Sequence, residues 1–251
     1  MAPNSRIIIC RHGQAEHNPV NDVKGDVNIP DALLTTIGKE QVAYLAHPSH
    51  ELEQKIASAS GLASPKNGPP QTHLLPKLQE EVQVIITSPL RRTLQTTLIG
   101  WKPAVERLGQ KNVICLPDAQ ERRDFPCDTG ASREDLEKNP EFEGSNFELL
   151  TPDWNGKKGK YSPKDEDMIE RAKRVRQYLR GRPEEHILLV GHGECIRFIV
   201  GTPAGKDKTH WDNAEVRIFK FDPETVDKDE CLLLEDAHVF PGFTDRKMPC
   251  Q

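Results

Sequence analysis

Two histidines stand at the ends of two similar apolar segments, and they are the residues of this chain best suited to chemistry. His12 follows the apolar run at 6–10, and His192 follows the apolar run at 187–190; a glycine comes directly after each histidine. A neutral imidazole can attack an electrophile or exchange a proton near neutral pH. The two segments therefore predict one site with two imidazoles, provided that the fold brings them together.

Permanent cations accompany the histidines. Arg11 precedes His12, and Arg91 and Arg92 follow the Ser-Pro pair at 88–89, which predicts a helix start. The planar fork of an arginine suits a phosphate or carboxylate, and the amino terminus of a helix adds free N–H groups. Neighbouring residues on a helix point about 100° apart. We therefore expect only one of the two adjacent arginines to face the site.

Two imidazoles and two guanidinium groups suit a phosphoryl group. One neutral histidine could attack phosphorus and carry the group covalently, while the arginines and the second histidine, protonated, stabilise its charge. The leaving oxygen then needs a proton from a carboxylic acid. Glu121 stands just past a predicted strand, and Asp124, Asp128 and Glu194 are alternatives that the sequence leaves open. No metal or cofactor is required, because the arginines neutralise the charge.

These side chains need a scaffold that joins positions about 180 residues apart. Alternating apolar runs and amphipathic stretches predict a mainly parallel α/β sheet, in which ligands bind beyond the carboxyl ends of the strands. We expect the alternating run at 216–221 to be an edge strand or a strand exposed on one face. The predicted strands are 6–10, 82–87, 112–116, 187–190 and 216–221, and the predicted helices are 36–46, one from 88, 132–138, 162–180 and 194–200.

Composition favours one domain over residues 1–251. The chain is 29% charged, has a formal net charge of −5 and contains no separating linker. This charge gives no attraction to nucleic acid, and neither a signal segment nor a run of about 18 apolar residues occurs. We therefore expect a cytoplasmic protein with no nucleic-acid or membrane partner. The six cysteines lack metal-site spacing and should be buried thiols.

Three segments do not fit the strand and helix alternation. The residues at 117–161 are irregular, and we interpret them as a lid or specificity insertion. Within that segment, the basic run at 157–160 is interpreted as a solvated loop. The stretch at 53–81 is rich in Ser, Pro, Gly and Gln, and its middle is interpreted as a mobile surface loop; the tail from about 241 is interpreted as weakly structured.

The motifs resemble those of the histidine phosphatase superfamily, in its phosphoglycerate mutase-like branch. They span roughly residues 6 to 221 in the right order, namely Arg11-His12-Gly13 with Asn18, Ser88 to Thr96, Glu121, and Gly191-His192-Gly193. The resemblance implies a three-layer α/β/α sandwich with a mainly parallel sheet. It also implies a phosphorylated nucleophile, its histidine partner, a proton donor and a phosphate pocket. The residues implied are His12 as nucleophile, His192 as partner, Glu121 as donor, and Arg11, Asn18, Arg92, His192 and Gly193 around the phosphate.

The function predicted from these residues is metal-independent hydrolysis of a small phosphorylated metabolite through a phosphohistidine. The segment at 121–126 does not resemble the matching segment of glycolytic mutases, which favours hydrolysis over mutase chemistry. A phosphomutase and a repurposed or purely phospholigand-binding member of the fold are the alternatives. The sequence leaves the substrate and the oligomeric state open.

Overall fold

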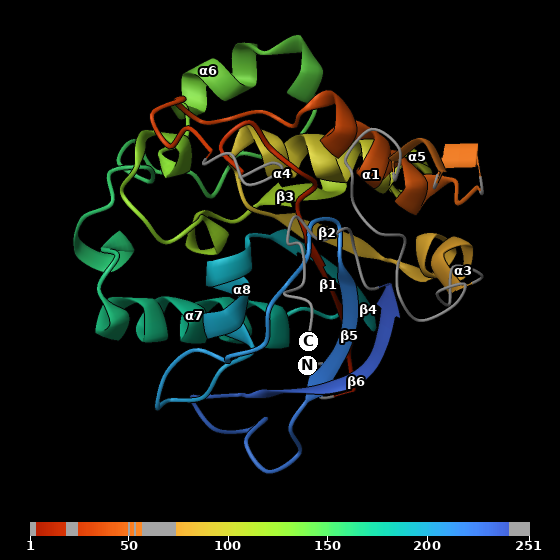
Figure 1. Ribbon diagram of the computed structural model, residues 1–251. Coiled ribbons are helices and arrows are strands. Elements are labelled where there is room, and N and C mark those ends of the chain that lie inside the picture. The colour runs from red at the N-terminus through yellow and green to blue at the C-terminus, as the bar shows by residue number, and fades with distance from the viewer. Residues whose placement is uncertain (1–3, 19–24, 50, 53, 57–73, 241–251) are drawn as a thin grey trace, which may run out of the picture.

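A six-stranded sheet forms the centre of the computed structural model, which describes residues 4–18, 25–49, 51, 52, 54–56 and 74–240 (Figure 1). The strand order is β3-β2-β4-β1-β5-β6. The strands are β1 Arg6–Arg11, β2 Val84–Thr87, β3 Val113–Cys115, β4 His186–Gly191, β5 Val216–Phe221 and β6 Leu233–Phe240. The first four are mutually parallel; β5 runs antiparallel to β1, and β6 runs antiparallel to β5. The predicted mainly parallel sheet is confirmed.

Helices cover both faces of this sheet. Alternate residues of β1 serve the two faces: Ile8 and Cys10 pack with α1, α3 and α5, while Ile7 and Ile9 pack with α7 and α8. All four side chains are fully buried, and each large apolar side chain contributes about 1.5–3 kcal/mol. The predicted three-layer α/β/α sandwich is therefore confirmed. The helices are α1 Thr36–Ala46, α3 Leu74–Glu81, α4 Arg91–Gln95, α5 Lys102–Leu108, α6 Arg133–Lys138, α7 Asp165–Arg180 and α8 Gly193–Ile199.

The prediction that 216–221 is an edge strand or a strand exposed on one face is wrong, because all of its residues except Lys220 are buried. β5 pairs with both β1 and β6, and β6 takes the edge. The alternation misleads because its first polar residue is buried: Arg217 lies over the Trp211 ring at 4.3 Å and forms an ion pair with Glu215 at 2.6 Å. A charged side chain that packs its stem and pairs its head can occupy an interior position.

Two helix predictions need correction. The end of the stretch at 53–81 forms α3, a helix missing from the predicted elements, whose Leu75 and Leu78 are buried; most of the middle, interpreted as a loop, lies outside the described residues. The helix expected from Ser88 begins at Arg91 instead, and Ser88 uses its hydroxyl elsewhere. The start of α1 is as predicted, because Thr35 accepts from the backbone N of Gly38 at 2.9 Å.

The segment at 117–161 is made of short helical pieces with a core of their own. Buried residues of this core pack against the beginning of α4; they are Leu136, Phe142, Phe147, Leu150, Trp154 and Tyr161. A Cβ on Gly130 would lie 2.2 Å from the Trp154 ring, so this backbone approach requires glycine. The segment is thus a packed cover rather than a loose loop. The tail expected from 241 lies outside the described residues.

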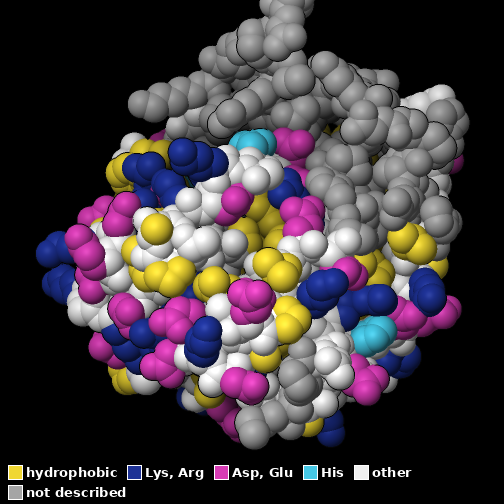
Figure 2. All heavy atoms as spheres, turned by 90° about the horizontal axis from the view of Figure 1, so that it is seen from below, with side chains coloured by type: hydrophobic (Ala, Val, Ile, Leu, Met, Phe, Trp, Pro, Cys, Tyr) yellow, Lys and Arg dark blue, Asp and Glu magenta, His cyan; other side chains and the backbone are white. Residues whose placement is uncertain are grey.

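Two observations bear on the charge of one face and on the helices of the described residues. On the face shown in Figure 2, basic and acidic side chains are interspersed. None of the helices among the described residues combines the length and the hydrophobicity that crossing a bilayer requires. All five cysteines in that part of the chain are buried free thiols, as predicted; they are Cys10, Cys115, Cys127, Cys195 and Cys231.

Candidate active site

The structure brings His12 and His192 together at the carboxyl edge of the sheet. β1 and β4 are parallel neighbours, with Arg11 opposite Gly191, so the two histidines follow adjacent strand ends. Their ring centroids lie 5.1 Å apart at an interplanar angle of 61°. Their exposed fractions are 2% and 0%. Residues 180 positions apart thus form one buried pair.

Glycines allow the turn after β1 to lie directly against α1. A Cβ on Gly13 would lie 2.7 Å from the carbonyl oxygen of Gly38, and one on Gly38 would lie 1.9 Å from that of Gln14. Either contact is far shorter than van der Waals separation, so the two backbones can approach only without side chains. This packing holds His12 over the end of its strand.

The hydrogen bonds of His12 define its tautomer. Its Nδ1 lies 2.6 Å from the carbonyl oxygen of Gly13, which can only accept, so Nδ1 carries the proton and Nε2 carries the lone pair. Burial, followed by the charges of Arg92 and Arg11, holds the pKa of His12 well below its ordinary value. The ring is therefore neutral, with the tautomer that a nucleophilic Nε2 requires.

Arg92 is fully buried beside that nitrogen. Its Nε donates to Nε2 of His12 at 3.3 Å, its Nη1 to the carbonyl oxygen of Cys127 at 2.6 Å, and its Nη2 to Asp128 at 2.8 Å. These bonds use three of the five guanidinium N–H groups. The cation is thus held at Nε2 of His12, and these three bonds leave two of its N–H groups for other acceptors.

Arg91 points away from the histidines, as the helical spacing predicts. Its guanidinium binds the carbonyl oxygen of Asp31 at 2.8 Å and forms an ion pair with the same residue at 3.3 Å. It therefore fixes the loop at 25–35 to the start of α4, whereas Arg92 faces the site.

His192 is the amino-terminal cap of α8, and one side of its ring is anchored. Its Nε2 lies 2.8 Å from Oγ of Ser88, while its Nδ1 is buried without a hydrogen-bond partner in the described part of the chain. Burial and the charge of Arg92 hold the pKa of His192 well below its ordinary value. The expected protonated ring is therefore not the state of the ligand-free protein. Ser88 is a site residue that sequence reasoning missed, because a Ser-Pro pair is typical of a helix cap.

Arg11 and Gly193 lie against one another. Nη1 of Arg11 donates to the carbonyl oxygen of Trp211 at 2.5 Å, and a Cβ on Gly193 would lie 3.2 Å from Nε of Arg11. The guanidinium therefore lies at the start of α8, whose first N–H groups carry a partial positive charge.

Asn18 is connected to His12 through a second amide. Its Oδ1 accepts from the backbone N of Ala15 at 2.9 Å and from Nδ2 of Asn213 at 3.4 Å, and the same Nδ2 donates to the carbonyl oxygen of His12 at 3.2 Å. In the ligand-free structure Asn18 thus shapes the turn beyond His12.

A third histidine borders the site. The His17 ring lies 5.9 Å from that of His12, and burial together with the charges of Arg92 and Arg11 lowers its pKa to about 2. Ligand atoms of His17, Cys127 and Asp128 lie within 4.8 Å of one another. However, Asp128 is already paired with Arg92, and the neighbouring cations oppose a metal ion at this position.

Of the four carboxylates considered, Glu121 has the environment of a proton donor. Its Oε1 accepts from the backbone N of Arg122 at 2.7 Å and from that of Cys195, in α8, at 3.1 Å. Burial and the neighbouring charge of Asp128 raise the pKa of Glu121. A carboxyl group in this setting remains protonated at a higher pH than an exposed one.

The remaining three carboxylates differ from it. Asp128 is the ion-pair partner of Arg92, and Asp124 is exposed to solvent. Glu194 contacts several cations; although burial alone would raise its pKa, the hydrogen bond and charge of Lys206, with the nearby arginines, lower it. Glu194 therefore stays ionised and is unsuited to donate a proton.

The interpretation of 157–160 as a solvated loop is wrong for its first residue. Lys157 is 7% exposed, and its Nζ donates to the carbonyl oxygen of Glu121 at 2.6 Å. No local pattern distinguishes this lysine from the exposed Lys158 beside it. The packing of the insertion places it, so the sequence carried no signal for its burial.

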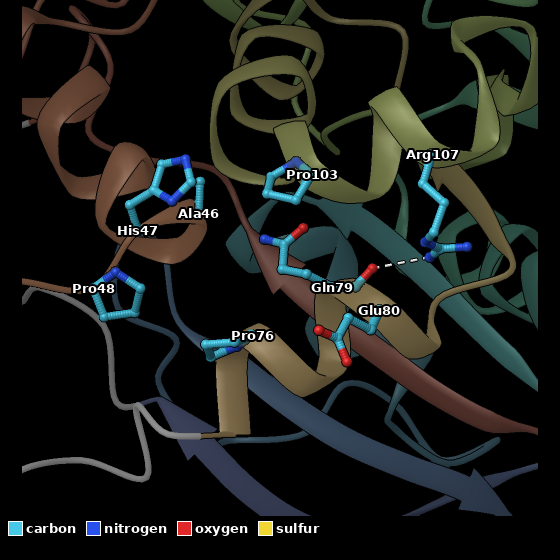
Figure 3. Close-up of a pocket in the computed structure, with 8 residues that line it drawn as sticks. All are labelled: Ala46, His47, Pro48, Pro76, Gln79, Glu80, Pro103 and Arg107. Carbon is cyan, nitrogen blue, oxygen red and sulfur yellow. Dashed lines mark hydrogen bonds between the residues drawn. The ribbon is translucent and has the colours of Figure 1, made fainter.

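A hollow of about 460 Å³ lies on a different part of the molecule. Figure 3 shows it between the end of α1, α3 and the start of α5, where Arg107 donates to the carbonyl oxygen of Gln79 at 2.9 Å. Neither histidine of the buried pair lines this hollow, and neither do Arg11, Arg92 or Glu121.

The chain is similar to a family of phosphatases and to one probable phosphatase. The model of the histidine phosphatase superfamily (branch 1) matches residues 70–231, a range that contains Arg92, Glu121 and His192. A probable phosphatase of Schizosaccharomyces pombe is 27% identical over 193 residues, which is 76% of this chain and 75% of that protein.

Solved structures share the fold at low identity. A structure titled mycobacterial hydrolase 1 has a TM-score of 0.51 at 16% identity and covers 94% of this chain and 99% of its own. A mycobacterial glucosyl-3-phosphoglycerate phosphatase has a TM-score of 0.49 at 15% identity, with 94% and 99% covered. At 16% identity, the similarity to mycobacterial hydrolase 1 bears on the fold alone.

Proposed function

The chain belongs to the histidine phosphatase superfamily and is an enzyme of the phosphatase class; on that premise we propose that it hydrolyses small phosphomonoesters through a phosphohistidine at His12. The observation that carries the proposal is the neutral His12 ring, whose Nε2 lone pair faces Arg92 at 3.3 Å and lies beside His192. A lone pair can attack phosphorus, and a cation beside it can stabilise the charge of the phosphoryl group.

In the first step, Nε2 of His12 attacks phosphorus and the bond from phosphorus to the ester oxygen breaks. The leaving oxygen takes the proton of Glu121, which then becomes a carboxylate. Arg92, Arg11 and the amino end of α8 balance the charge on the transferred group. The bound dianion raises the pKa of His192, so that its ring can protonate and donate to a phosphoryl oxygen.

In the second step, the Glu121 carboxylate accepts a proton from water as the water oxygen attacks phosphorus. The bond from phosphorus to nitrogen breaks, Nε2 recovers its lone pair, and inorganic phosphate leaves. Glu121 is then protonated again, and the site returns to its starting state. The protein groups supply the nucleophile, the proton and the positive charge, and the reaction needs no metal ion.

The geometry supports a small substrate. Both imidazoles and Arg92 are almost fully buried. The segment at 117–161, which we propose to be a lid and specificity wall, supplies Asp128 and Lys157 to the same region. A macromolecular phosphate would need an open approach. We further propose that the described domain works in the cytoplasm, on a small metabolite.

Phosphate release from a panel of small phosphomonoesters, with and without EDTA, tests the proposal. We expect release that EDTA leaves unchanged, and a loss of at least about 10³-fold for His12→Ala. Full activity of His12→Ala, or no release from any ester by the wild type, would reject it. A mutase would instead require a bisphosphate primer and release little phosphate.

A further inference from the structure

Lys157 is a buried cation next to Glu121 that the mechanism above does not use. Its Nζ lies 2.6 Å from the carbonyl oxygen of Glu121, and its side chain is 7% exposed. Its backbone φ is +50°, in the left-handed region that residues with a side chain rarely adopt. Such a conformation persists only where the surrounding structure enforces it, and it is frequent at functional sites.

The segment that carries Lys157 is bound on both sides of the site. The carbonyl oxygen of Trp154 accepts from Nε2 of Gln120 at 2.7 Å, and Nδ2 of Asn155 donates to the carbonyl oxygen of Gly130 at 2.7 Å. Residues 154–157 thus connect the backbone before Glu121 with the loop after Asp128. The later part of the insertion thus reaches Glu121, near the beginning of the same insertion, through Lys157.

A second buried cation binds the neighbouring peptide. Nη2 of Arg171, from α7, donates to the carbonyl oxygen of Gln120 at 3.0 Å. Two successive carbonyl groups, those of Gln120 and Glu121, therefore each accept a hydrogen bond from a buried cationic side chain. Hydrogen bonds from charged donors are stronger than neutral ones. The backbone on which the acid side chain stands is held from two directions.

Charged and titratable groups face Lys157 from every side of the site. They are Glu121, Arg92 of α4, Asp128 of the 3₁₀ helix Pro126–Asp128, Arg171 of α7, and His192 and Cys195 at the start of α8. Burial, followed by the charge of Arg171, lowers the pKa of Lys157 to about 7, although Asp128 and Glu121 oppose the change. Its charge is thus sensitive to the state of the site near neutral pH.

We propose that Lys157 is a positioning residue for proton donation. Its bond to the Glu121 carbonyl fixes the backbone from which the carboxyl group reaches the leaving oxygen, so that proton transfer requires residues 154–157 to be packed against Glu121. This inference rests on the proposed function, with Glu121 as the proton donor. Lys157 acts through Glu121 and is not itself required to touch the substrate.

The dependence on the leaving group separates this role from a structural one. p-Nitrophenol is an acidic alcohol that leaves with little help, whereas glycerol and serine need a proton. The measurement is the ratio of kcat/KM for p-nitrophenyl phosphate to that for β-glycerophosphate and for phosphoserine. Because the rates come from one protein sample, partial unfolding lowers them equally and leaves the ratio unchanged.

We expect Glu121→Gln to lose about 10²-fold or more on the alkyl esters and far less on the aryl ester. Lys157→Met should lose at least about tenfold more on the alkyl esters than on the aryl ester, and Lys157→Arg, which keeps a cationic donor, should restore much of the ratio. Lys158→Met, the matched control on the same segment, should behave as wild type.

An equal loss on both ester types in Lys157→Met, beside a selective loss in Glu121→Gln, would overturn the positioning role alone. A non-selective loss in Glu121→Gln would overturn the acid assignment and the positioning role with it. Absence of hydrolysis by the wild type, or an active His12→Ala, would overturn the proposed function itself.

Discussion

In the ligand-free protein the Nε of Arg92 donates a hydrogen bond to Nε2 of His12 at 3.3 Å. The cation that we propose to bind the phosphoryl group therefore also holds the proposed nucleophilic atom before substrate arrives. Its position is fixed in turn by the ion pair with Asp128 at 2.8 Å. Nucleophile, cation and carboxylate form one buried unit, and its members should depend on one another.

Replacing Arg92 by Met should destabilise the protein through Asp128. The carboxylate is almost fully buried, and removing its partner leaves an uncompensated charge, at a cost of about 3–5 kcal/mol. Urea unfolding measures the free energy of unfolding. The double variant Arg92→Met with Asp128→Asn removes both charges and should recover much of the loss. If the loss of unfolding free energy in the double variant equals the sum of the losses in Arg92→Met and in Asp128→Asn, the proposed coupling is wrong.

Replacing Ser88 by Ala should slow turnover without unfolding the protein. The His192 ring would lose the hydrogen bond that orients it, which is worth about 0.5–1.5 kcal/mol, or roughly a two- to tenfold loss in kcat. Ser132→Ala, which removes the cap of α6 away from the histidines, should leave kcat unchanged. Unaltered kcat in Ser88→Ala would show that the orientation of His192 does not limit the reaction.

Replacing Gly193 by Ala should weaken substrate binding. The added Cβ would lie 3.2 Å from Nε of Arg11, and the guanidinium must shift by a few tenths of an ångström from the start of α8. A displaced ligand for the phosphoryl group should raise KM by about three- to tenfold. Gly181→Ala, at the end of α7, adds a Cβ at ordinary contact distance and is the matched control. A KM equal to that of the wild type would place Arg11 outside the phosphate pocket.

The histidine pair should make stability fall in mild acid. Burial and neighbouring cations depress the pKa of both His12 and His192, whereas an unfolded histidine has a pKa of about 6.5. Below that value the unfolded chain binds protons that the folded chain does not. Stability from each ring is therefore complete above about pH 6.5 and is lost as the pH falls, by up to about 1.4 kcal/mol per pH unit.

Urea unfolding between pH 7 and pH 5 measures this slope. In His192→Gln the change in unfolding free energy per pH unit should decrease by the contribution of one histidine ring. This decrease does not depend on the absolute stability of the variant. His47→Gln, at an exposed position, should keep the full slope. A slope in His192→Gln equal to that of the wild type would mean that the ring is not held neutral in the folded protein.

The sheet and the histidine pair could be predicted from sequence because local signals and topology agree. The runs before His12 and His192 are apolar, short and followed by glycine, and parallel strands deliver their carboxyl ends to one edge. Residue spacing on a helix predicted that only one of Arg91 and Arg92 faces the site, and the resemblance to the family motif identified that residue as Arg92. The positions of these residues follow mainly from the strand or helix that carries each of them, and those elements have clear local sequence patterns.

The rest depended on contacts between distant segments. The same Lys-rich run contains the buried Lys157 and the exposed Lys158, and only the packing of the insertion separates them. Ser88 was interpreted as a helix cap because its partner, His192, lies 104 positions away. Arg217 made β5 look like an edge strand, although its ion pair allows it to be buried. The partners of Lys157 and Ser88 are remote in sequence, whereas the partner of Arg217, Glu215, lies only two positions away and the burial of the pair is set by tertiary packing.

Trapping of the covalent intermediate tests the central claim most directly. The protein is mixed with p-nitrophenyl phosphate, quenched in alkali, where phosphohistidine survives, and digested for mass spectrometry. We predict one phosphoryl group on Nε2 of His12, more of it in Glu121→Gln because water activation is slowed, and none in His12→Gln. Turnover by the wild type with no phosphoryl group on His12, or with the group on another residue, would contradict the account.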